Sequence, residues 1–530
     1  MPESPEIVEL VLPPKEANDP AILSQKALQK AGKDAATYEV KLLRRSIDAR
    51  QRPVFRLRVG LYPKNQSPEG SNHIGRLQSV ANAPEVLVVG AGPAGYFAAL
   101  ELIEQGLKPI VLDRGKPVRD RRRDLRAIQQ FGEVNPNSNY CFGEGGAGTY
   151  SDGKLYTRSV KRGNALKVLE LLVEHGAQED ILIDAHPHIG SNKLPKIVSN
   201  IRETILQLGG EVHFDAKVTN ILIEDLQIQG VVVNSEHILR CDHLILATGH
   251  SARDIFQLLA DKGVEMHSKP FALGIRVEHP QALIDQFQYR QSPREENLPA
   301  SSYRLVAQSD DRGVFSFCMC PGGLIVPAAT QPGELVVNGM SMSRRDSKFA
   351  NSGIVVAIEL EDLESLGFTG LFAAMDFQRS VEQSLFQHGD GSQKAPAQRL
   401  TDFLKNRTSK SVNPTSYIPG LYSAPMHELL PSLVVKRLQA GFRQFDRKMK
   451  GYVTDQANII GVESRTSSPI RIPRDKDTRM HPQVKGLFPC GEGAGYAGGI
   501  LSAAMDGQNV ARSLKQYYKE EGKRKKEEGN

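Results

Sequence analysis

The chain has 530 residues, too many for one ordinary domain and suited to two or three. Hydrophobic residues make up 40% of it, which is enough for a substantial core, and 67 Lys and Arg against 61 Asp and Glu give a formal net charge of +6. This excess is mild for the length, so it suits anionic ligands but does not by itself indicate a nucleic-acid-binding protein.

Targeting and cysteine usage predict a cytoplasmic protein. The opening stretch MPESPEIVEL lacks a basic region followed by an apolar one, and no apolar run approaches the ~20 residues of a transmembrane helix. The 5 cysteines form no CxxC pair and are typical of reduced thiols. Cys318 and Cys320 could form a redox or metal site, but a buried strand with two small apolar side chains is favoured. His186 and His188 could suggest a metal, but no set of cysteine and acidic ligands accompanies them, so no metal site is predicted.

Residues 1–80 are predicted to form a small basic α+β domain that ends in a linker. ILSQKALQKAG looks helical, and YEVKLLRRSIDARQRPVFRLRVGLY alternates like strands on either side of a helical or turn segment. The stretch from Tyr38 to Arg58 contains seven basic and two acidic residues. It is either a surface for nucleic acid or a protein partner, or a basic face that is solvated or packed against acidic groups of the main body.

From Glu85 the chain alternates between strand and helix. EVLVVG is a short buried strand, AGPAGYFAALELIEQG is helical, and KPIVLDRG is a second strand, so together they form a βαβ unit of a parallel sheet. SNKLPKIVSNIRETILQL is predicted to be a helix capped by Ser191 or Asn192. DHLILATG is apolar throughout, as expected of a central parallel strand.

The turn VVGAGPAG has the GxGxxG spacing of a dinucleotide-binding site, after a strand and before a helix. Gly90 permits the tight turn, Gly92 lets the backbone approach a pyrophosphate, and Gly95 lets helix and strand pack closely. The phosphates are expected at the helix N-terminus beside Pro93 and Ala94, where free N–H groups and the helix dipole favour anions.

An acidic residue follows at the end of the second strand. Asp113 lies 23 positions after Gly90, where a carboxylate can hold ribose hydroxyls. Arg114 and the basic cluster at 119–124 come next. They either meet an adenosine phosphate or belong to a solvated helix face.

A second glycine-rich loop, CFGEGGAGTYSDGKL, spans residues 141–155. Its glycines let backbone amides face a flat ligand, and the bordering Phe142 and Tyr150 argue against an ordinary surface loop. Lys154 could place positive charge near an electron-rich ring. The residues assigned to cofactor binding here are Gly145, Gly146, Gly148, Thr149, Ser151 and Asp152.

LILATG is a buried strand that ends in a turn expected to pass close to the dinucleotide. Ala247, Thr248 and Gly249 are therefore assigned to the cofactor site, together with Val218 in the strand-like run EVHFDAKVTNILIE. His250 follows directly, and it could be a proton relay, a cap or a surface residue.

The late stretch CGEGAGYAGGILSAAMDG places one carboxylate among glycines at the start of a helix. Glu492 can accept hydrogen bonds from a ribityl chain, and the amides that follow it can address a pyrophosphate. The helix N-terminus would point at the pyrimidine edge of a flavin, where its partial positive charge stabilises the reduced state. The assigned residues are Gly491, Glu492, Gly493, Ala494, Gly498, Gly499 and Ile500.

Together these motifs resemble those of flavoproteins of the two-dinucleotide-binding-domain class. More narrowly, the chain from about residue 38 to 512 resembles the uncharacterised FAD-dependent dehydrogenases of bacteria, an NAD(P)/FAD-dependent oxidoreductase family. The likeness lies in GEGGAGTYSDGKL, HPHIGSNKL, NGMSMSRRDSKFANSGIVV, VESRTSSPIRI and CGEGAGYAGGILSAAMDG. Two positions depart from the wider flavoprotein pattern, with Asp113 where Glu is usual and Glu492 where Asp is usual. Both keep the charge.

The resemblance implies an α/β fold: a Rossmann-like FAD-binding domain, built on a parallel sheet with helices, with an inserted α+β substrate domain and the small N-terminal domain. The FAD-binding domain is predicted over 81–260 and 481–515, the inserted domain over 261–480, and a charged tail that frays from a helix over 516–530.

The expected function is that of an FAD-dependent oxidoreductase (a dehydrogenase) that transfers hydride or electrons through a non-covalent flavin to or from an unidentified small molecule. NAD(P)H is a candidate transient donor. Arg465 and Lys154 are the candidate catalytic residues, and Arg465 either contacts an anionic substrate or the flavin, or ties two domains together. The alternative is a flavin-containing factor that binds RNA or protein through the basic N-terminal domain, although nucleic acid is not the expected partner.

Overall fold

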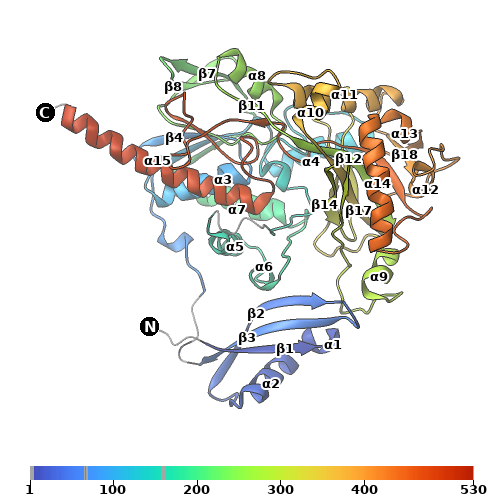
Figure 1. Ribbon diagram of the computed structural model, residues 1–530. Helices are drawn as coiled ribbons and strands as arrows, with labels where there is room; N and C mark the ends of the chain where they lie inside the picture. Colours follow the sequence, from blue (N-terminus) through green and yellow to red (C-terminus); the bar gives the residue numbers. More distant parts are fainter. Residues whose placement is uncertain (1–4, 65, 67–69, 157–162, 529–530) are drawn as a thin grey trace.

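The computed structural model describes residues 5–64, 66, 70–156 and 163–528, which form three parts (Figure 1). The N-terminal part, at the bottom of that view, is an antiparallel sheet in the order β1-β3-β2. Val8, Leu10 and Leu12 alternate with exposed residues along β1, so the sheet has one buried face, which packs against α2. Its elements are β1 (Glu6–Leu12), α1 (Pro14–Ala17), α2 (Pro20–Ala31), β2 (Tyr38–Asp48) and β3 (Val54–Pro63).

The second part is built on a five-stranded sheet in the order β22-β10-β4-β5-β6, whose neighbouring strands are parallel. Val86 and Val88 face a core formed with helices α3, α7 and α15, whereas Leu87 and Val89 face a core formed with α8 and a small antiparallel sheet. This arrangement confirms the predicted Rossmann-like sheet, in which β10 is an inner strand between β22 and β4. The sheet strands are β4 (Glu85–Val89), β5 (Lys108–Leu112), β6 (Glu211–His213), β10 (Leu244–Leu246) and β22 (Leu487–Pro489).

Helices α3 and α15 of this part begin beside each other, although about 400 residues separate them in the sequence. A Cβ on Gly507 of α15 would lie 2.1 Å from the carbonyl oxygen of Ala94 in α3, so the glycine permits this close approach. α15 runs through the predicted charged tail as far as residue 528. The remaining elements are α3 (Pro93–Glu104), α4 (Val118–Phe131), α5 (Ala165–Glu174), α6 (Asp180–Ile183), α7 (Leu194–Gln207), β7 (Val218–Glu224), β8 (Gln227–Val233), β9 (His237–Arg240), α8 (Arg253–Asp261) and α15 (Ile500–Glu528), with 3-10 turns η1 (Ile74–Arg76) and η2 (Gly146–Gly148).

The predicted cap of helix α7 is wrong. The helix starts after Lys193, and no side chain caps it. The Ser191 hydroxyl instead donates to the carbonyl of Ser341 at 3.1 Å, and the Asn192 amide donates to the Ser343 hydroxyl at 3.1 Å. Both side chains are used for contacts with a segment 150 residues away, which leaves them unable to serve the helix.

The third part is a seven-stranded sheet in the order β13-β14-β17-β12-β20-β18-β19, with helices around it. The chain enters it after β11 and leaves it before β21, and these two short strands pair with each other. The predicted boundaries at 260 and 480 lie near this ladder and stay predictions. The elements are β11 (His267–Ser268), β12 (Phe271–Pro280), α9 (Gln281–Tyr289), β13 (Val306–Ser309), β14 (Arg312–Cys320), β15 (Leu324–Pro327), β16 (Val337–Met340), β17 (Phe349–Ile358), α10 (Leu360–Ser365), α11 (Ala373–His388), β18 (Ala395–Arg399), α12 (Leu400–Phe403), β19 (Leu421–Ser423), α13 (Met426–Leu429), α14 (Ser432–Lys448), β20 (Asn458–Glu463) and β21 (Ile470–Arg471).

Among the described residues, none of the helices combines the length and the apolar character that a membrane crossing requires.

Candidate cofactor and substrate site

A continuous cavity of about 1540 Å³ starts at the carboxyl ends of the parallel strands and extends into the third part of the molecule. Val89 at the end of β4, Leu112 at the end of β5 and Ala247 just after β10 all line it. From β4 the chain continues to β5 and β6 on one side of the sheet, and it later adds β10 and β22 on the other side. Open α/β sheets bind ligands at such a switch point, which here lies next to β4.

The turn after β4 has room for a phosphate beside its backbone. Gly90 has φ +109°, and a Cβ there would lie 2.3 Å from the carbonyl oxygen of Ala247. A Cβ on Gly95 would lie 1.8 Å from the carbonyl oxygen of Gly90, so neither position accepts a side chain. A Cβ on Gly92 would meet nothing closer than Gly146 Cα at 3.9 Å, so Gly92 faces open cavity. This geometry fits a dinucleotide at the N-terminus of α3, where Pro93 and Ala94 also line the cavity.

Asp113 joins this turn to the second glycine-rich loop. Its carboxylate accepts hydrogen bonds from the backbone N–H groups of Ala91 (2.8 Å), Gly115 (2.8 Å) and Gly143 (3.1 Å). It lines the cavity while being only 7% exposed. The carboxylate therefore organises three backbone segments around the position assigned to the ribose.

The basic residues after Asp113 have uses that the sequence interpretation missed. Arg114 stacks over the Phe142 ring with its guanidinium carbon 4.5 Å from the ring centroid, and it pairs with Asp254 at 2.7 Å. Arg121, from the cluster at 119–124, is fully buried and donates to the backbone carbonyls of Glu144 and Gly146 in the second glycine-rich loop and to that of Asn139 just before it. Its sequence context, a run of charges, carried no signal for this role.

The second glycine-rich loop packs against both helix starts. A Cβ on Gly146 would lie 3.2 Å from Gly92 Cα, and one on Gly148 would lie 3.0 Å from the Ile500 side chain. Of the residues assigned here, Gly146, Gly148, Ser151 and Asp152 line the cavity. Gly145 and Thr149 lie behind the loop, where the Thr149 hydroxyl donates to a backbone carbonyl at 3.1 Å.

The turn after β10 forms another wall, to which Ala247, Thr248, Gly249 and the assigned Val218 contribute. His250 also lines the cavity, and its Nδ1 lies 2.8 Å from the Ser251 hydroxyl. Burial, together with the nearby charges of Arg465 and Arg253, lowers the pKa of His250 to about 4. A neutral imidazole therefore faces the cavity at physiological pH.

Glu492 lines the cavity near the start of α15. Burial raises the pKa of its carboxyl to about 7, and Lys269 opposes that rise only in part. Its carboxylate makes no hydrogen bond with any residue that the structure describes. A half-buried carboxyl that faces the cavity in this state fits a ligand that supplies hydroxyl donors.

The residues around Glu492 divide into cavity-facing and supporting positions. Gly498, Gly499 and Ile500 line the cavity, and a Cβ on either glycine would meet no atom within 4 Å. Gly491, Gly493 and Ala494 lie outside the lining, and Gly491 donates its N–H to Asp506 at 2.8 Å. The start of α15 is therefore open to a ligand.

The part of the cavity beyond the loops is lined by charged side chains. Asp152 lies 3.5 Å from the Lys154 ammonium and pairs with Arg345, and it accepts a hydrogen bond from Ser341. Burial alone would raise the pKa of Asp152, but these neighbours bring it down to about 2. Lys154 also donates to the carbonyl of Met319. Two cations thus share one carboxylate, which leaves a net positive charge.

Strand β14 turns Cys318 toward the cavity. The pairing of β14 with β17 shifts register between Phe317 and Cys320, and Cys318 has φ +43°. Cys320 is buried as predicted, but the prediction of burial is wrong for Cys318, which is exposed and lines the cavity. A β-bulge re-aims a side chain in this way, and the sequence carries no mark of it.

Behind this bulge lies a buried ion pair that sequence reasoning also missed. Arg276 on β12 pairs with Glu463 on β20 at 2.6 Å, and both are buried. It donates further to the Cys318 carbonyl and to the Asn338 side chain, which both line the cavity.

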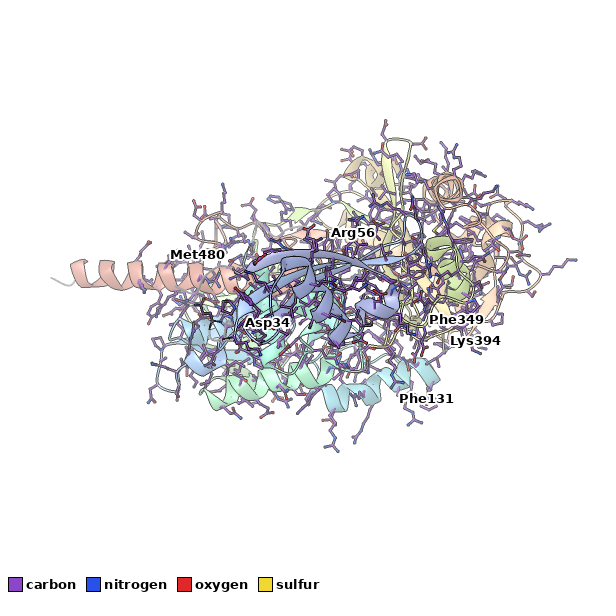
Figure 2. The ribbon with its side chains drawn as sticks, turned by 90° about the horizontal axis from the view of Figure 1, so that it is seen from below. Asp34, Arg56, Phe131, Phe349, Lys394 and Met480 are labelled. Atoms are coloured by element: carbon purple, nitrogen blue, oxygen red, sulfur yellow. The ribbon has the colours of Figure 1, made fainter. Side chains whose placement is uncertain are left out.

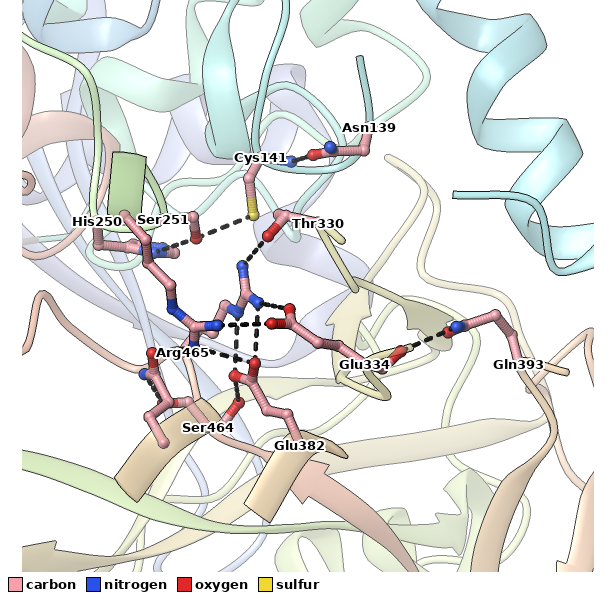
Figure 3. A network of polar contacts seen from close by, with 12 residues as sticks. Asn139, Cys141, His250, Ser251, Thr330, Glu334, Glu382, Gln393, Ser464 and Arg465 are labelled. Carbon is pink, nitrogen blue, oxygen red and sulfur yellow. Dashed lines mark hydrogen bonds and ion pairs between the residues drawn. The ribbon is translucent and has the colours of Figure 1, made fainter. Parts of the chain in front are cut away.

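Arg465 belongs to a buried network of two arginines and two glutamates (Figure 3). Its guanidinium pairs with Glu334 at 2.7 Å and Glu382 at 3.0 Å, and Arg253 pairs with the same two residues at 2.8 and 3.0 Å. The third Arg465 nitrogen donates to the Thr330 hydroxyl. Because Arg253 begins α8 and the other members lie in the third part, the network connects the two parts beside the cavity.

Comparison with known proteins gives matches to three family descriptions and to several individual proteins. Three family descriptions match the chain: a domain of unknown function at residues 4–62, an FAD binding domain at 85–123, and an FAD-dependent protein, C-terminal domain-like, at 270–466. A thiamine thiazole synthase of Aeropyrum pernix is 26% identical over 200 residues, which cover 35% of this chain and 61% of the relative. A crystal structure of CtdE in complex with FAD and substrate 4 covers 82% of this chain and 81% of its own, at 12% identity and a TM-score of 0.34.

An uncharacterised protein of Clostridium beijerinckii is 41% identical over 493 residues, which cover 89% of this chain and 91% of the relative. A likeness of this extent, carried by an FAD binding domain and an FAD-dependent C-terminal domain, is a family relationship. The chain belongs to the family of FAD-dependent proteins that includes this clostridial relative, and FAD is its cofactor.

Proposed function

We propose that the chain is an FAD-dependent oxidoreductase that moves hydride or electrons between its flavin and a small molecule. The proposal rests on the continuity of the cavity from the dinucleotide turn into the third part. Its volume of about 1540 Å³ is larger than the roughly 300–1000 Å³ of an ordinary ligand pocket, so a second molecule can lie beside the cofactor.

The residues that would hold FAD are the turn at Gly90–Gly95, Asp113, Glu492 and the start of α15. When bound, FAD supplies the ring that accepts and releases electrons. The starts of α3 and α15 would hold the negative charge of the pyrophosphate and of the reduced ring, because both helix dipoles present positive ends to the cavity. The walls of the cavity come from all three parts of the molecule.

Lys154 is proposed as the cation that contacts the substrate. Its ammonium is held by Asp152 and the Met319 carbonyl and faces the cavity. Arg465 is proposed as a positioning residue, since all three of its nitrogens already have protein partners. His250, neutral and held by the Ser251 hydroxyl, presents an uncharged hydrogen-bonding group to the cavity.

An anaerobic bleaching experiment tests the proposal. The purified protein should be yellow, and the flavin absorbance should fall when a physiological reductant is added without oxygen. NADH and NADPH are the first donors to try, followed by pooled metabolites. A yellow protein that no donor bleaches would reject the oxidoreductase while leaving the FAD site intact.

Several charges of the N-terminal basic stretch are already paired within the protein, which weakens the alternative of an RNA- or protein-binding factor. Arg45 pairs with Asp184, and both Arg50 and Arg56 pair with Asp48. A nucleic-acid complex should also weaken steeply with salt. Retention on nucleic acid that disappears with residues 1–80 would revive this alternative.

A further inference from the structure

The N-terminal domain is attached to the FAD-binding part through strand β2. The Arg45 side chain pairs with Asp184 at 2.7 Å and with Asp180 at 3.6 Å, both on or beside α6. The backbone of Arg45 also accepts a hydrogen bond from the Ala185 N–H at 3.0 Å. Side chain and backbone thus fix the same point of β2.

A second attachment reaches the third part. Tyr289, the last residue of helix α9, and Leu298, in the segment after it, are buried in the hydrophobic core of the N-terminal domain. The Asn18 side chain donates to the carbonyl of Asn297 at 3.0 Å. Figure 2, which views the molecule from below, shows the N-terminal domain lying across the middle of the other two parts. Attachment at both ends holds the turn between β2 and β3 in place.

The end of β2 and that turn form one wall of the cavity, to which β2 contributes Ile47 and the turn contributes Ala49 and Arg50. The facing walls come from α9, from the segment before β13 and from the end of α14. Five basic residues are both exposed and part of this lining, and we call them the mouth cluster: Arg50, Arg290, Arg304, Lys448 and Lys450. They mark where the cavity meets solvent.

The charge of the cavity is unbalanced at this mouth. Among the described residues that line it, ten are basic and four are acidic. Three of the acids, Asp113, Asp254 and Glu492, lie around the cofactor site, and the fourth is Asp152. The mouth cluster therefore has no acidic residue among its cavity-lining neighbours.

Most of these charges are also free of ion pairs. Arg50 pairs with Asp48, and Lys448 donates to the Val306 carbonyl. Arg290, Arg304 and Lys450 form no ion pair within the part of the chain that the structure describes. Like charges gathered at the rim of a low-dielectric cavity raise the local concentration of anions and speed their entry.

We propose that the mouth cluster binds an organic molecule with two or more acidic groups, and that the N-terminal domain serves to complete this binding site. The inference rests on the proposed function, because the bound molecule is the one that exchanges electrons with the flavin. Lys154 and Arg345, which share only Asp152, provide a second anchor deeper in the cavity. The acidic groups are the carboxylates of an organic acid or the phosphates of a nicotinamide dinucleotide.

Calorimetry on the full-length, FAD-loaded protein tests this proposal without turnover. The probes are citrate, for the organic acid, and 2′-phospho-ADP-ribose, for the dinucleotide. Arg290→Gln/Arg304→Gln/Lys450→Gln should weaken the better probe by roughly tenfold to a hundredfold, in a salt-sensitive manner. Arg50→Gln alone should weaken it about threefold, because Asp48 already shares that charge.

The matched control is Arg58→Gln/Lys262→Gln/Lys405→Gln, which removes three exposed charges outside the cavity lining and should leave binding unchanged. The flavin spectrum and thermal midpoint show whether each variant is folded and loaded. Equal weakening by both triple variants, or no binding of either probe to the wild-type protein, would overturn the proposal. If Arg50→Gln bound the probe as tightly as the wild-type protein while the triple variant of the mouth cluster bound it more weakly, the N-terminal domain would have no part in the binding site. If the probes bound as expected but no donor bleached the flavin, the oxidoreductase proposal would be rejected and the anion-binding site would stand.

Discussion

The cofactor end and the substrate end of the cavity are built from different chemical groups. At the cofactor end, backbone amides and glycines form most of the binding surface, and Gly90, Gly92 and Gly95 lie within six residues. At the substrate end, side chains such as Lys154 and Arg345 meet from positions nearly 200 residues apart. Recognition through the backbone leaves a spacing pattern in the sequence, whereas recognition through assembled side chains leaves none.

The largest effect is expected from a substitution that disrupts only the cofactor end of the cavity. Gly92→Val should give a folded protein that holds less than about a tenth of the wild-type FAD. Gly92 has φ −78°, which valine accepts, but its Cβ would project into open cavity where the pyrophosphate is expected. Flavin absorbance per mole of protein measures the loss.

Gly70→Val is the control for that substitution. Gly70 is exposed, and a Cβ there would meet no atom within 4 Å, so full FAD content is expected. Full FAD content in Gly92→Val would place the cofactor somewhere other than this turn. Gly95→Val is unsuitable as a test, because its Cβ would overlap the Gly90 carbonyl and the fold itself would fail.

The next effect concerns the junction between the two ends. Glu382→Gln should lower the thermal midpoint by about 10 °C, because it leaves the buried Arg253 and Arg465 with one carboxylate between them, at a cost of roughly 3–5 kcal/mol. Asp390→Asn removes an exposed partner of Lys394 and should shift the midpoint by less than about 2 °C. Similar shifts in both variants would mean that the buried network does not hold the domains together.

The cofactor end of the cavity could be predicted from the sequence, whereas most of the substrate end could not. The βαβ unit, the inner parallel strand β10 and the FAD cofactor are confirmed, because hydrophobic runs and glycine spacing are local signals. The bulge that exposes Cys318, the buried Arg121 and the mouth cluster were not foreseen. Each depends on which strands pair or which loops meet, and that information lies in long-range packing.

A smaller effect sharpens the assignment of Glu492. Its folded pKa of about 7 lies above the ordinary 4.5, so its contribution to the stability of the cofactor-free protein is full below pH 4.5 and is lost as the pH rises through about 7. FAD hydroxyls favour the ionised carboxylate. The affinity for FAD should therefore rise roughly tenfold between pH 6 and pH 8 in the wild-type protein.

Glu492→Gln has no carboxyl at this position, so its FAD affinity should vary little over the same range. Fluorescence titration of cofactor-free protein with FAD measures both profiles. Parallel pH profiles for the two proteins would show that another group controls the pH dependence and that Glu492 does not contact the cofactor.

The smallest effect tests the corrected role of the residues before α7. Asn192→Ala should destabilise the protein by about 0.5 kcal/mol, which corresponds to roughly 1–2 °C in the thermal midpoint, because it loses two solvent-exposed hydrogen bonds to Ser343. If the Asn192 side chain were a helix cap, its contribution to stability would not depend on Ser343. If it makes a contact between domains, its contribution depends on Ser343. The cycle with Ser343→Ala should accordingly show that the two substitutions together cost less than the sum of each alone. Strict additivity would restore Asn192 as a local group of the helix start, and the tie between residues 191–192 and 341–343 would then rest on Ser191 and the backbone.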